Sequence, residues 1–414
     1  MTLRNLHVDS ARLWDSLMEM ARIGPGVAGG NNRQALTDAD GEARHLFRRW
    51  CEEAGMTVSV DTMGSMFALR PGADPSLAPV CIGSHLDTQP TGGKYDGVLG
   101  VLAGLEVVRT LNDAGITTRH PLCLVNWTNE EGCRFAPAMM ASGVFAGVID
   151  EDWALDRRDA SGLRFGDELA RIGWKGSEPV GARRIDSMFE LHIEQGPVLE
   201  EADRTIGVVT HGQGLRWIEG RLRGRAQHTG TTPMYSRHDC TLALARMIDL
   251  VREIALRHQP DAVGTIGHVE LTPNSRNVIA GEVVFTADLR SHRPEVLAAM
   301  EEAFRSRAPG LAAGAGSRLT MELVGAFEPP AFDPGLARIV REAADMLGHS
   351  HMDIVSGAGH DACWINRVAP TVMIMCPCVG GLSHNEAEAI TPGWAAAASD
   401  VLAHSVLARA GVVS

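Results

Sequence analysis

The chain has 414 residues, of which 45% are hydrophobic and 21% charged, as expected for a folded protein of two domains. Its net charge of −13 excludes a nucleic-acid-binding surface, because phosphate binding needs clustered Lys and Arg. We find no apolar span long enough for a membrane, no apolar signal core and no CxxC pair among the eight cysteines, which together predict a cytoplasmic protein with reduced thiols.

The N-terminal elements are two predicted helices joined by a long polar loop. Apolar residues recur at helical spacing over 10–23. The Gly- and Asn-rich segment 24–40 is expected to be a loop, which either faces the substrate or lies on the surface. The second helix is expected over 41–55, with Asp38 or Asp40 as its N-cap.

A hairpin and a buried helix are predicted next. Residues 57–72 alternate in polarity and turn at Met63–Gly64, which is typical of a hairpin. The segment 97–111 reads as a buried helix, and its glycine spacing indicates close helix packing rather than phosphate binding, because no GxGxxG follows a strand. Small residues over 136–147 are expected to pack beneath the site, and 150–185 to form short outer helices.

Polar residues follow two apolar, strand-like runs at the point where each run ends. VCIGSH leads into His85 and Asp87, with Asp96 after a glycine-rich turn, and CLVNWT leads into Glu130 and Glu131. Functional residues of open α/β sheets lie at such carboxyl ends. These residue types suit a divalent metal with a spare carboxylate for acid–base work. A chance His-x-Asp pair and solvated glutamates are the alternative reading.

A third strand and two later turns supply further histidines. In MFELHIEQGPVLE, His192 alternates with apolar residues and shares a face with Glu190 and Glu194. A lone strand histidine is more often structural than a ligand, but its place at a strand end favours a ligand. His360 lies in a glycine-rich turn without an assigned role, and His384 lies in the polar loop GGLSHNEAEAI.

The middle of the chain has a different pattern. Residues 212–327 read as strand–helix–strand–strand–helix–strand, the ferredoxin-like βαββαβ order. This predicts a catalytic α/β domain formed by 1–211 and 328–414, with 212–327 inserted into it.

Five candidate ligands come from four strand ends, and a two-metal site needs about this number if one carboxylate bridges. They are His85, Asp96, Glu131, His192 and His384.

Two further carboxylates lie beside these ligands. Asp87 is placed to orient the His85 imidazole. Glu130 is placed to take a proton from a metal-bound water.

The motifs in order are GSHLDTQPTGGKYDGVLGV, TNEEGCRF, ELHIEQGPVLE, QHTGTTPM, NSRNVIAG, ADLRS, GAGHDA and LSHNEAE. With them the chain resembles the M20 metallopeptidase-type amidohydrolases. Within these it resembles the zinc-dependent subfamily of N-carbamoyl-L-amino acid amidohydrolases, β-ureidopropionases and allantoate amidohydrolases. The resemblance implies a three-layer, aminopeptidase-like α/β catalytic domain with an inserted ferredoxin-like lid that also forms a homodimer.

The resemblance also implies the ligand sets. One ion would be held by His85, Asp96 and His192, and the other by Asp96, Glu131 and His384. The ions are expected to be zinc, with manganese, cobalt or nickel as alternatives.

Roles for other residues come from the same resemblance. Glu130 matches the general base and Asp87 a carboxylate behind the ligands. Gln195 matches a residue near the substrate amide. His228 matches a lid histidine that polarises the scissile carbonyl, often from the partner subunit.

The substrate carboxylate is expected to be held by Asn277 and Arg290, although Asn277 could instead cap a turn and Arg290 form a surface ion pair. The fork of an Arg suits a carboxylate. Allantoate-specific members tend to have an Arg ahead of QHTGTTP, where this chain has Trp217, with Arg216 beside it.

The expected reaction is therefore hydrolysis of the C–N bond of an N-carbamoyl amino acid to the free amino acid, ammonia and carbon dioxide. The substrate would be a small ureido or amide molecule with a carboxylate. Alternatives are an allantoate amidohydrolase, an aminoacylase or dipeptidase of the same fold, and a metal-binding protein without turnover.

Overall fold

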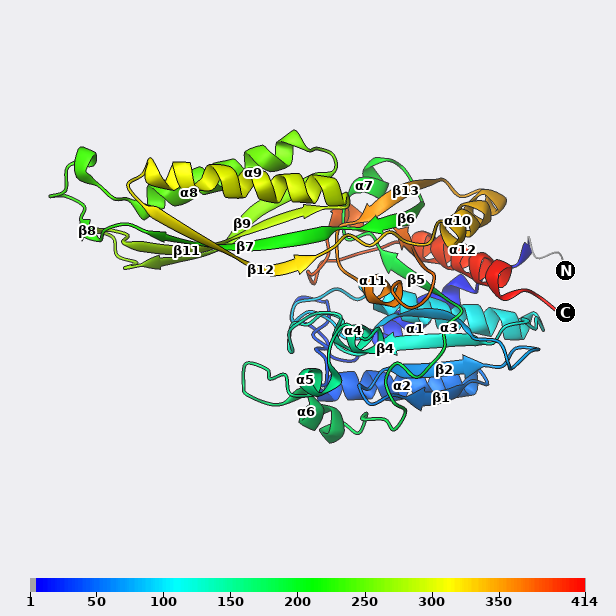
Figure 1. The fold of residues 1–414 in the computed structure, drawn as a ribbon. Coiled ribbons are helices and arrows are strands. Elements are labelled where there is room, and N and C mark those ends of the chain that lie inside the picture. Colours follow the sequence, from blue (N-terminus) through cyan, green and yellow to red (C-terminus); the bar gives the residue numbers. More distant parts are fainter. Residues whose placement is uncertain (1–4, 414) are drawn as a thin grey trace. The chain divides into compact units, whose positions relative to one another are not determined.

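The computed structural model describes residues 5–413, which form two compact units (Figure 1). Unit 1 comprises the described residues up to Thr210 and from Phe332 onward, and unit 2 comprises His211–Ala331. Within residues 5–413 no helix combines the length and the apolar composition that a membrane crossing requires.

The centre of unit 1 is a mixed sheet of eight strands in the order β1-β2-β4-β3-β5-β14-β6-β13. The neighbours β4, β3, β5 and β14 are parallel, whereas β1 pairs antiparallel with β2, β2 with β4, and β6 with β14. The strands are β1 (Thr57–Val60), β2 (Met66–Arg70), β3 (Val80–His85), β4 (Leu122–Trp127), β5 (Ser187–Ile193), β6 (Ile206–Gly212), β13 (His351–Ser356) and β14 (Thr371–Cys376).

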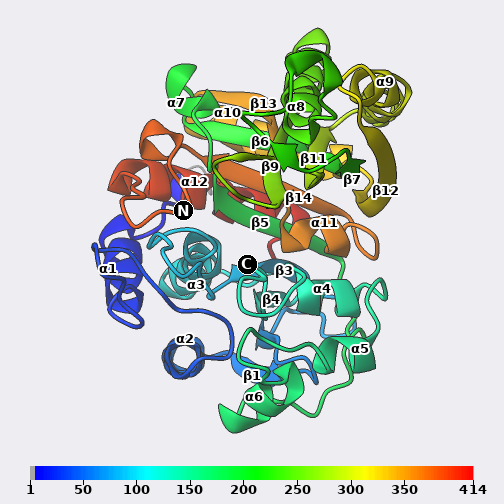
Figure 2. The same ribbon diagram turned by 90° about the vertical axis from the view of Figure 1, so that its left-hand side faces the viewer.

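Helices cover both faces of this sheet (Figure 2). The helices α1, α3, α10 and α12 form one layer, and α4 and α11 contact the other face. The helices of unit 1 are α1 (Ser10–Met20), α2 (Asp38–Glu53), α3 (Val98–Asp113), α4 (Met140–Phe145), α5 (Glu151–Leu155), α6 (Phe165–Arg171), α7 (Val198–Glu201), α10 (Pro334–Leu347), α11 (Asp361–Ile365) and α12 (Pro392–Ala410), with a 3-10 turn at η3 (Val379–Gly381).

The central strands β3, β4, β5 and β14 are buried at every position. Strands covered by helices on both faces need apolar residues throughout rather than an alternating pattern. The apolar runs that form β3 and β5 therefore lie in the middle of the sheet. Because the two strands are parallel, the polar residues at their carboxyl ends lie on the same side of the sheet.

Most predicted elements are confirmed, including the hairpin of β1 and β2 and the helix α3. The predicted cap of α2 was wrong, because the side chain of Thr37 accepts from the backbone N–H of Asp40. Asp40 lies inside the first turn and pairs with Arg44 at 2.9 Å. The short strands β6 and β13 were not predicted.

Unit 2 is a four-stranded antiparallel sheet in the order β12-β7-β11-β9, with α8 and α9 packed on one face. Chain order is β7-α8-β9-β11-α9-β12, and a small second sheet pairs β8 with β10. The elements are β7 (Gly214–Arg223), β8 (Gln227–His228), η2 (Met234–Ser236), α8 (Cys240–Arg257), β9 (Ala262–Thr272), β10 (Val278–Ile279), β11 (Glu282–Ser291), α9 (Pro294–Ala313) and β12 (Arg318–Phe327).

Candidate metal centre

Three parallel strands bring the predicted ligands together. His85 is the last residue of β3, His192 lies near the end of β5, and Glu130 and Glu131 follow β4. Because β4, β3 and β5 are parallel neighbours, their carboxyl ends meet at one edge. Asp96 reaches the same edge from the turn before α3.

The ligand atoms form two groups that share Asp96. In the first, Oδ1 of Asp96 lies 3.1 Å from Nε2 of His192 and 3.7 Å from Nε2 of His85. In the second, Nε2 of His384 lies 3.3 Å from Oδ2 of Asp96 and 3.4 Å from Oε2 of Glu131. Within each group the ligand atoms all lie within 4.8 Å of one another. Each group thus faces a different oxygen of one carboxylate.

The residues fit a divalent cation. Nε2 of His192 is buried and, although close to Asp96, has no partner in hydrogen-bonding geometry among residues 5–413. Burial, together with the charge of Asp96, raises the pKa of Glu131 to about 8. Imidazole nitrogens and carboxylate oxygens around an unsatisfied buried atom are the donors that such ions prefer.

Glu130 and Glu131 point to different groups although they are adjacent. Asn129 before them adopts a left-handed φ of 59°, which turns the chain. Oε2 of Glu130 lies 3.5 Å from Nε2 of His85, whereas Glu131 faces His384. Burial, reinforced by the nearby acids, raises the pKa of Glu130 well above its usual range. Glu130 is thus a buried carboxylate beside the first group.

The carboxylate of Asp87 was expected to orient the His85 imidazole, but it contacts other groups. The Nδ1 atom of His85 bonds the backbone carbonyl of Asp87 at 2.9 Å, not its carboxylate. The carboxylate instead accepts from the backbone N–H groups of Glu130, at 3.3 Å, and Glu131, at 3.2 Å. Asp87 therefore holds both strand-end loops.

Gln195 lies at the second group. Its Nε2 donates to Oδ2 of Asp96 at 2.8 Å, and its backbone φ is 60°. Sequence reasoning missed a counterpart, Gln89, which donates to both oxygens of Glu131 through its backbone and side chain. Its place two residues after Asp87, in the same motif, was the available signal.

Two carboxylates of the His384 loop, Glu386 and Glu388, were also missed. Glu388 accepts from the backbone N–H groups of Tyr95 and Asp96, and Glu386 from the loop after α1. The sequence LSHNEAE already placed both acids within four residues of His384.

His360, which had no assigned role, packs against the first group. Its ring centroid lies 4.4 Å from that of His192, and its Nε2 bonds Ser356 at 3.0 Å. With Glu190 and His192 it forms a further buried cluster of possible ligands.

The other predicted substrate residues lie in unit 2. His228 is exposed, and its Nδ1 accepts from the backbone N–H groups of Gly230, at 3.0 Å, and Thr231, at 3.3 Å. This fixes the tautomer with the proton on Nε2. The backbone carbonyl of Asn277 accepts from the N–H of Thr229 at 3.0 Å, so Asn277 lies directly beside the pair of β8, which carries His228, and β10.

Arg290 forms the ion pair that was the alternative to a substrate clamp. Its Nε and Nη2 contact the carboxylate of Asp288 at 3.1 and 2.9 Å.

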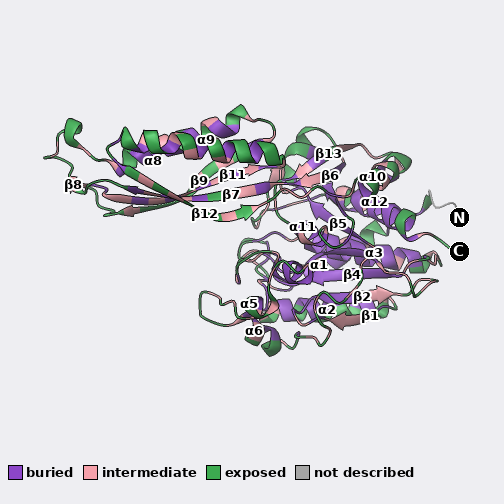
Figure 3. Cartoon of the chain, in the orientation of Figure 1, coloured by how far each residue is buried: buried purple, intermediate pink, exposed green. Residues whose placement is uncertain are grey.

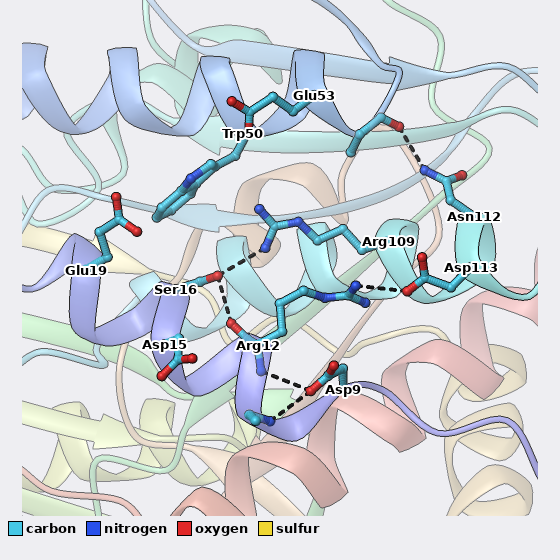
Figure 4. Close-up of a pocket in the computed structure, with 12 residues that line it drawn as sticks. Asp9, Arg12, Asp15, Ser16, Glu19, Trp50, Glu53, Arg109, Asn112 and Asp113 are labelled. Carbon is cyan, nitrogen blue, oxygen red and sulfur yellow. Dashed lines mark hydrogen bonds and ion pairs between the residues drawn. The ribbon is translucent and has the colours of Figure 1, made fainter.

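A groove of about 600 Å³ lies elsewhere in unit 1, between α1, α2 and α3 (Figure 4). Its cations have partners, because Arg12 pairs with Asp113 at 2.8 Å and Arg109 donates to Ser16 at 3.0 Å and lies over the Trp50 ring. No histidine or cysteine is among its lining residues. The groove therefore lacks the imidazole donors that gather at the strand ends.

Comparisons with known proteins agree with this geometry. The family model of peptidase family M20/M25/M40 matches residues 81–408. An N-carbamoyl-L-amino-acid amidohydrolase of Rhizobium meliloti is 61% identical over 99% of this chain and 98% of its own length. An allantoate amidohydrolase of Bacillus subtilis is 33% identical over 90% of this chain and 91% of its own length.

A solved structure gives the same result. The crystal structure of an amidase of the hydantoinase/carbamoylase family from Burkholderia multivorans superposes with a TM-score of 0.94 and 53% identity, covering 98% of both chains. The chain belongs to peptidase family M20/M25/M40, and its mixed α/β fold with a large central sheet is that of this family.

Proposed function

We propose that the chain is a dinuclear metal-dependent amidohydrolase that cleaves the C–N bond of an N-carbamoyl amino acid. The observation that carries this proposal is the pair of ligand groups that share Asp96, with Glu130 beside the first. The full-length similarity to the Rhizobium meliloti enzyme supports the N-carbamoyl substrate.

In this proposal one ion is held by His85, Asp96 and His192, and the other by Asp96, Glu131 and His384. We propose zinc, with manganese, cobalt or nickel as alternatives, because all donors are imidazole or carboxylate. Two bound cations would supply Lewis acidity, which lowers the pKa of water and polarises the ureido carbonyl.

Glu130 acts as the base. Its carboxylate takes a proton from the attacking water, whose oxygen bonds to the ureido carbon, and returns that proton to the amino-acid nitrogen as the C–N bond breaks. The amino acid leaves with its nitrogen as the free amine, and the remaining carbamate separates into ammonia and carbon dioxide.

Four residues are proposed to contact the substrate: Gln195, His228, Asn277 and Arg290. The Nε2 proton of His228 would donate to the developing oxyanion, and Gln195 would contact the amide. Asn277 and Arg290 would hold the substrate carboxylate. Because Arg290 is paired with Asp288, the substrate carboxylate must compete with Asp288 for the guanidinium.

We further propose that unit 2 is a ferredoxin-like lid through which a homodimer forms in the cytoplasm. The βαββαβ element order and the strand order β12-β7-β11-β9 support the ferredoxin-like assignment.

A substrate panel tests the proposed function. Ammonia release from N-carbamoyl amino acids, allantoate and N-acetyl or dipeptide substrates would be compared on protein stripped of metal and then reloaded. We expect turnover of N-carbamoyl amino acids only after reloading. Equal turnover by the stripped protein would contradict the metal mechanism, and a preference for another amide would contradict the substrate.

Allantoate is the second candidate, because the Bacillus subtilis relative carries that name. The residues ahead of the QHTGTTP turn argue against it. Trp217 stands at the aligned position, and the guanidinium of Arg216 is engaged by Glu301 and Glu328. Arg216 would have to leave both carboxylates to bind an anionic substrate.

A further inference from the structure

The loop between β14 and α12, residues 377–391, carries the most exposed ligand. The side chain of His384 is 49% exposed, and its backbone has a left-handed φ of 51°. Little packing therefore holds this imidazole against Asp96 and Glu131, and its position depends on the contacts made by the rest of the loop.

Glu386 anchors one side of this loop. Its Oε1 accepts from the backbone N–H of Val27 at 3.2 Å, and its Oε2 accepts from the N–H groups of Ala28 and of Gly30, the latter at 3.1 Å. Backbone N–H groups that converge in this way form an anion-binding nest. A Cβ on Gly26 would lie 2.3 Å from Oε2, so the nest accommodates Glu386 only while residue 26 has no side chain.

Glu388 anchors the other side. Its Oε1 accepts from the backbone N–H groups of Tyr95, at 3.0 Å, and Asp96, at 3.1 Å. The hydroxyl of Ser383 lies 3.0 Å from both Oε2 of Glu388 and Oδ2 of Asp96. A Cβ on Gly93 would lie 2.0 Å from Oε1, which shows how closely the buried carboxylate approaches that turn.

We propose that Glu386 and Glu388 are positioning residues that set the geometry of the second ligand group. Glu386 fixes the loop that presents His384, and Glu388 joins the same loop to the turn that presents Asp96. The glycine-rich loop 24–32 is then the receptor for Glu386, which gives a function to the polar loop after α1. The inference rests on the proposed function, because it takes His384 and Asp96 as metal ligands.

The two carboxylates differ in what they should affect. Removing Glu386 frees His384 alone, so one ion should bind more weakly. Removing Glu388 also frees Asp96, which both groups share, so both ions should bind more weakly. Residues that hold metal ligands in this way typically change metal affinity by about 10–100-fold.

The first experiment measures the affinity of each Zn²⁺ by chelator competition, with the absorption spectrum of the Co²⁺-loaded protein as a second readout. For Glu386→Ala we expect one affinity to fall about 10–100-fold and the other to stay unchanged. The Co²⁺ spectrum should change, and kcat should fall more than KM rises. Glu386→Gln, which keeps one acceptor oxygen, should recover part of the affinity. Glu388→Ala should weaken both ions.

The reciprocal experiment alters the receptor instead of the carboxylate. In Gly26→Ala the added methyl group should expel Glu386 from the nest and reproduce the Glu386→Ala affinities, although residue 26 is not a ligand. The matched control is Glu200→Ala, which removes a comparable contact to the backbone N–H of Gly380, at 2.6 Å, in the same loop. We expect wild-type affinities for this control.

Wild-type affinities and spectrum in Glu386→Ala, or equal losses in Glu200→Ala and Glu386→Ala, would overturn the inference. A wild-type protein that binds no Zn²⁺ would overturn the proposed function as well. The two failures are distinguished by the wild-type titration, and thermal unfolding of each variant shows whether it has folded.

Discussion

The two units hold their candidate functional residues in opposite ways. In unit 1, His85, Asp96 and His192 are at most 4% exposed and lie at the ends of the central strands, which are buried at every position. In unit 2, His228 is exposed, and the strands β9 and β12 are largely exposed as well (Figure 3). The buried set is fixed by packing, whereas His228 is fixed by two local backbone bonds. Substitutions that displace the buried set should therefore combine losses of activity, metal and stability, and substitution of His228 should affect activity alone.

The largest effect is expected for Glu130→Gln. The amide keeps the size of the side chain but cannot take a proton, so kcat should fall by about 10²–10⁴-fold while metal content stays at the wild-type level. Steady-state kinetics and elemental analysis of the purified variant measure both. Near wild-type turnover at full metal occupancy would show that another group is the base.

Gly97→Ala should disturb the buried set through packing. Gly97 has a φ of 69°, and a Cβ there would lie 2.3 Å from Nε2 of His85. Gly115→Ala is the control, because its φ is 65° but its Cβ would meet nothing within 4 Å. The positive φ should cost at least about 1–2 kcal/mol in both variants.

Gly97→Ala should lower the free energy of unfolding further, by about 3 kcal/mol in total, because its methyl group displaces the candidate ligand His85. It should also lower the metal affinity, which Gly115→Ala should not. Urea unfolding and chelator competition compare the two variants. Equal losses would mean that His85 tolerates the added methyl group.

His228→Ala tests the exposed set. Loss of one oxyanion donor should lower kcat/KM by about 10²-fold, without a change in Tm because the ring is exposed. His268→Ala, at another exposed histidine of unit 2, should leave both quantities unchanged. A fall in Tm with His228→Ala would place this residue among the structural ones.

The smallest effect is a pH dependence of stability from a buried acid of unit 1. Burial raises the pKa of Asp61 to about 7, although Oδ1 accepts from the N–H groups of Met63 and Ser65. The unfolded chain releases this proton near pH 4. Between about pH 4 and pH 7 the folded state keeps a proton that the unfolded state loses, so stability falls as pH rises through this window.

Asp61→Asn keeps the oxygen acceptor but cannot ionise. Between about pH 4 and pH 7 its free energy of unfolding should therefore fall by about 2 kcal/mol less than that of the wild type. Urea unfolding at pH 4.5, 6 and 7.5 measures it, with the exposed Asp152→Asn as control. Parallel pH profiles in wild type and Asp61→Asn would assign the decline to other groups.

The gathering of the candidate ligands could be predicted because their signal is local. His85, Glu131 and His192 each follow or end an apolar run, and parallel strands bring such ends together whatever lies between them. The N-cap of α2 could not be decided in this way, because Thr37, Asp38 and Asp40 are all good caps. In the folded chain the two carboxylates are engaged elsewhere, Asp38 by Arg171 of α6 and Asp40 by Arg44 of its own helix, and Thr37 is the cap.

The sequence by itself determined the type of most elements, the order of the motifs and the identity of the residues that gather at the strand ends. Only the tertiary structure decided which oxygen of Asp96 faces which histidine, that the carboxylate of Asp87 holds the backbone of Glu130 and Glu131, and that Glu386 lies in a nest formed 359 positions earlier in the chain. The physical reason is that strand and helix patterns arise from neighbours along the chain, whereas hydrogen-bond partners are chosen by whichever groups folding brings within about 3 Å.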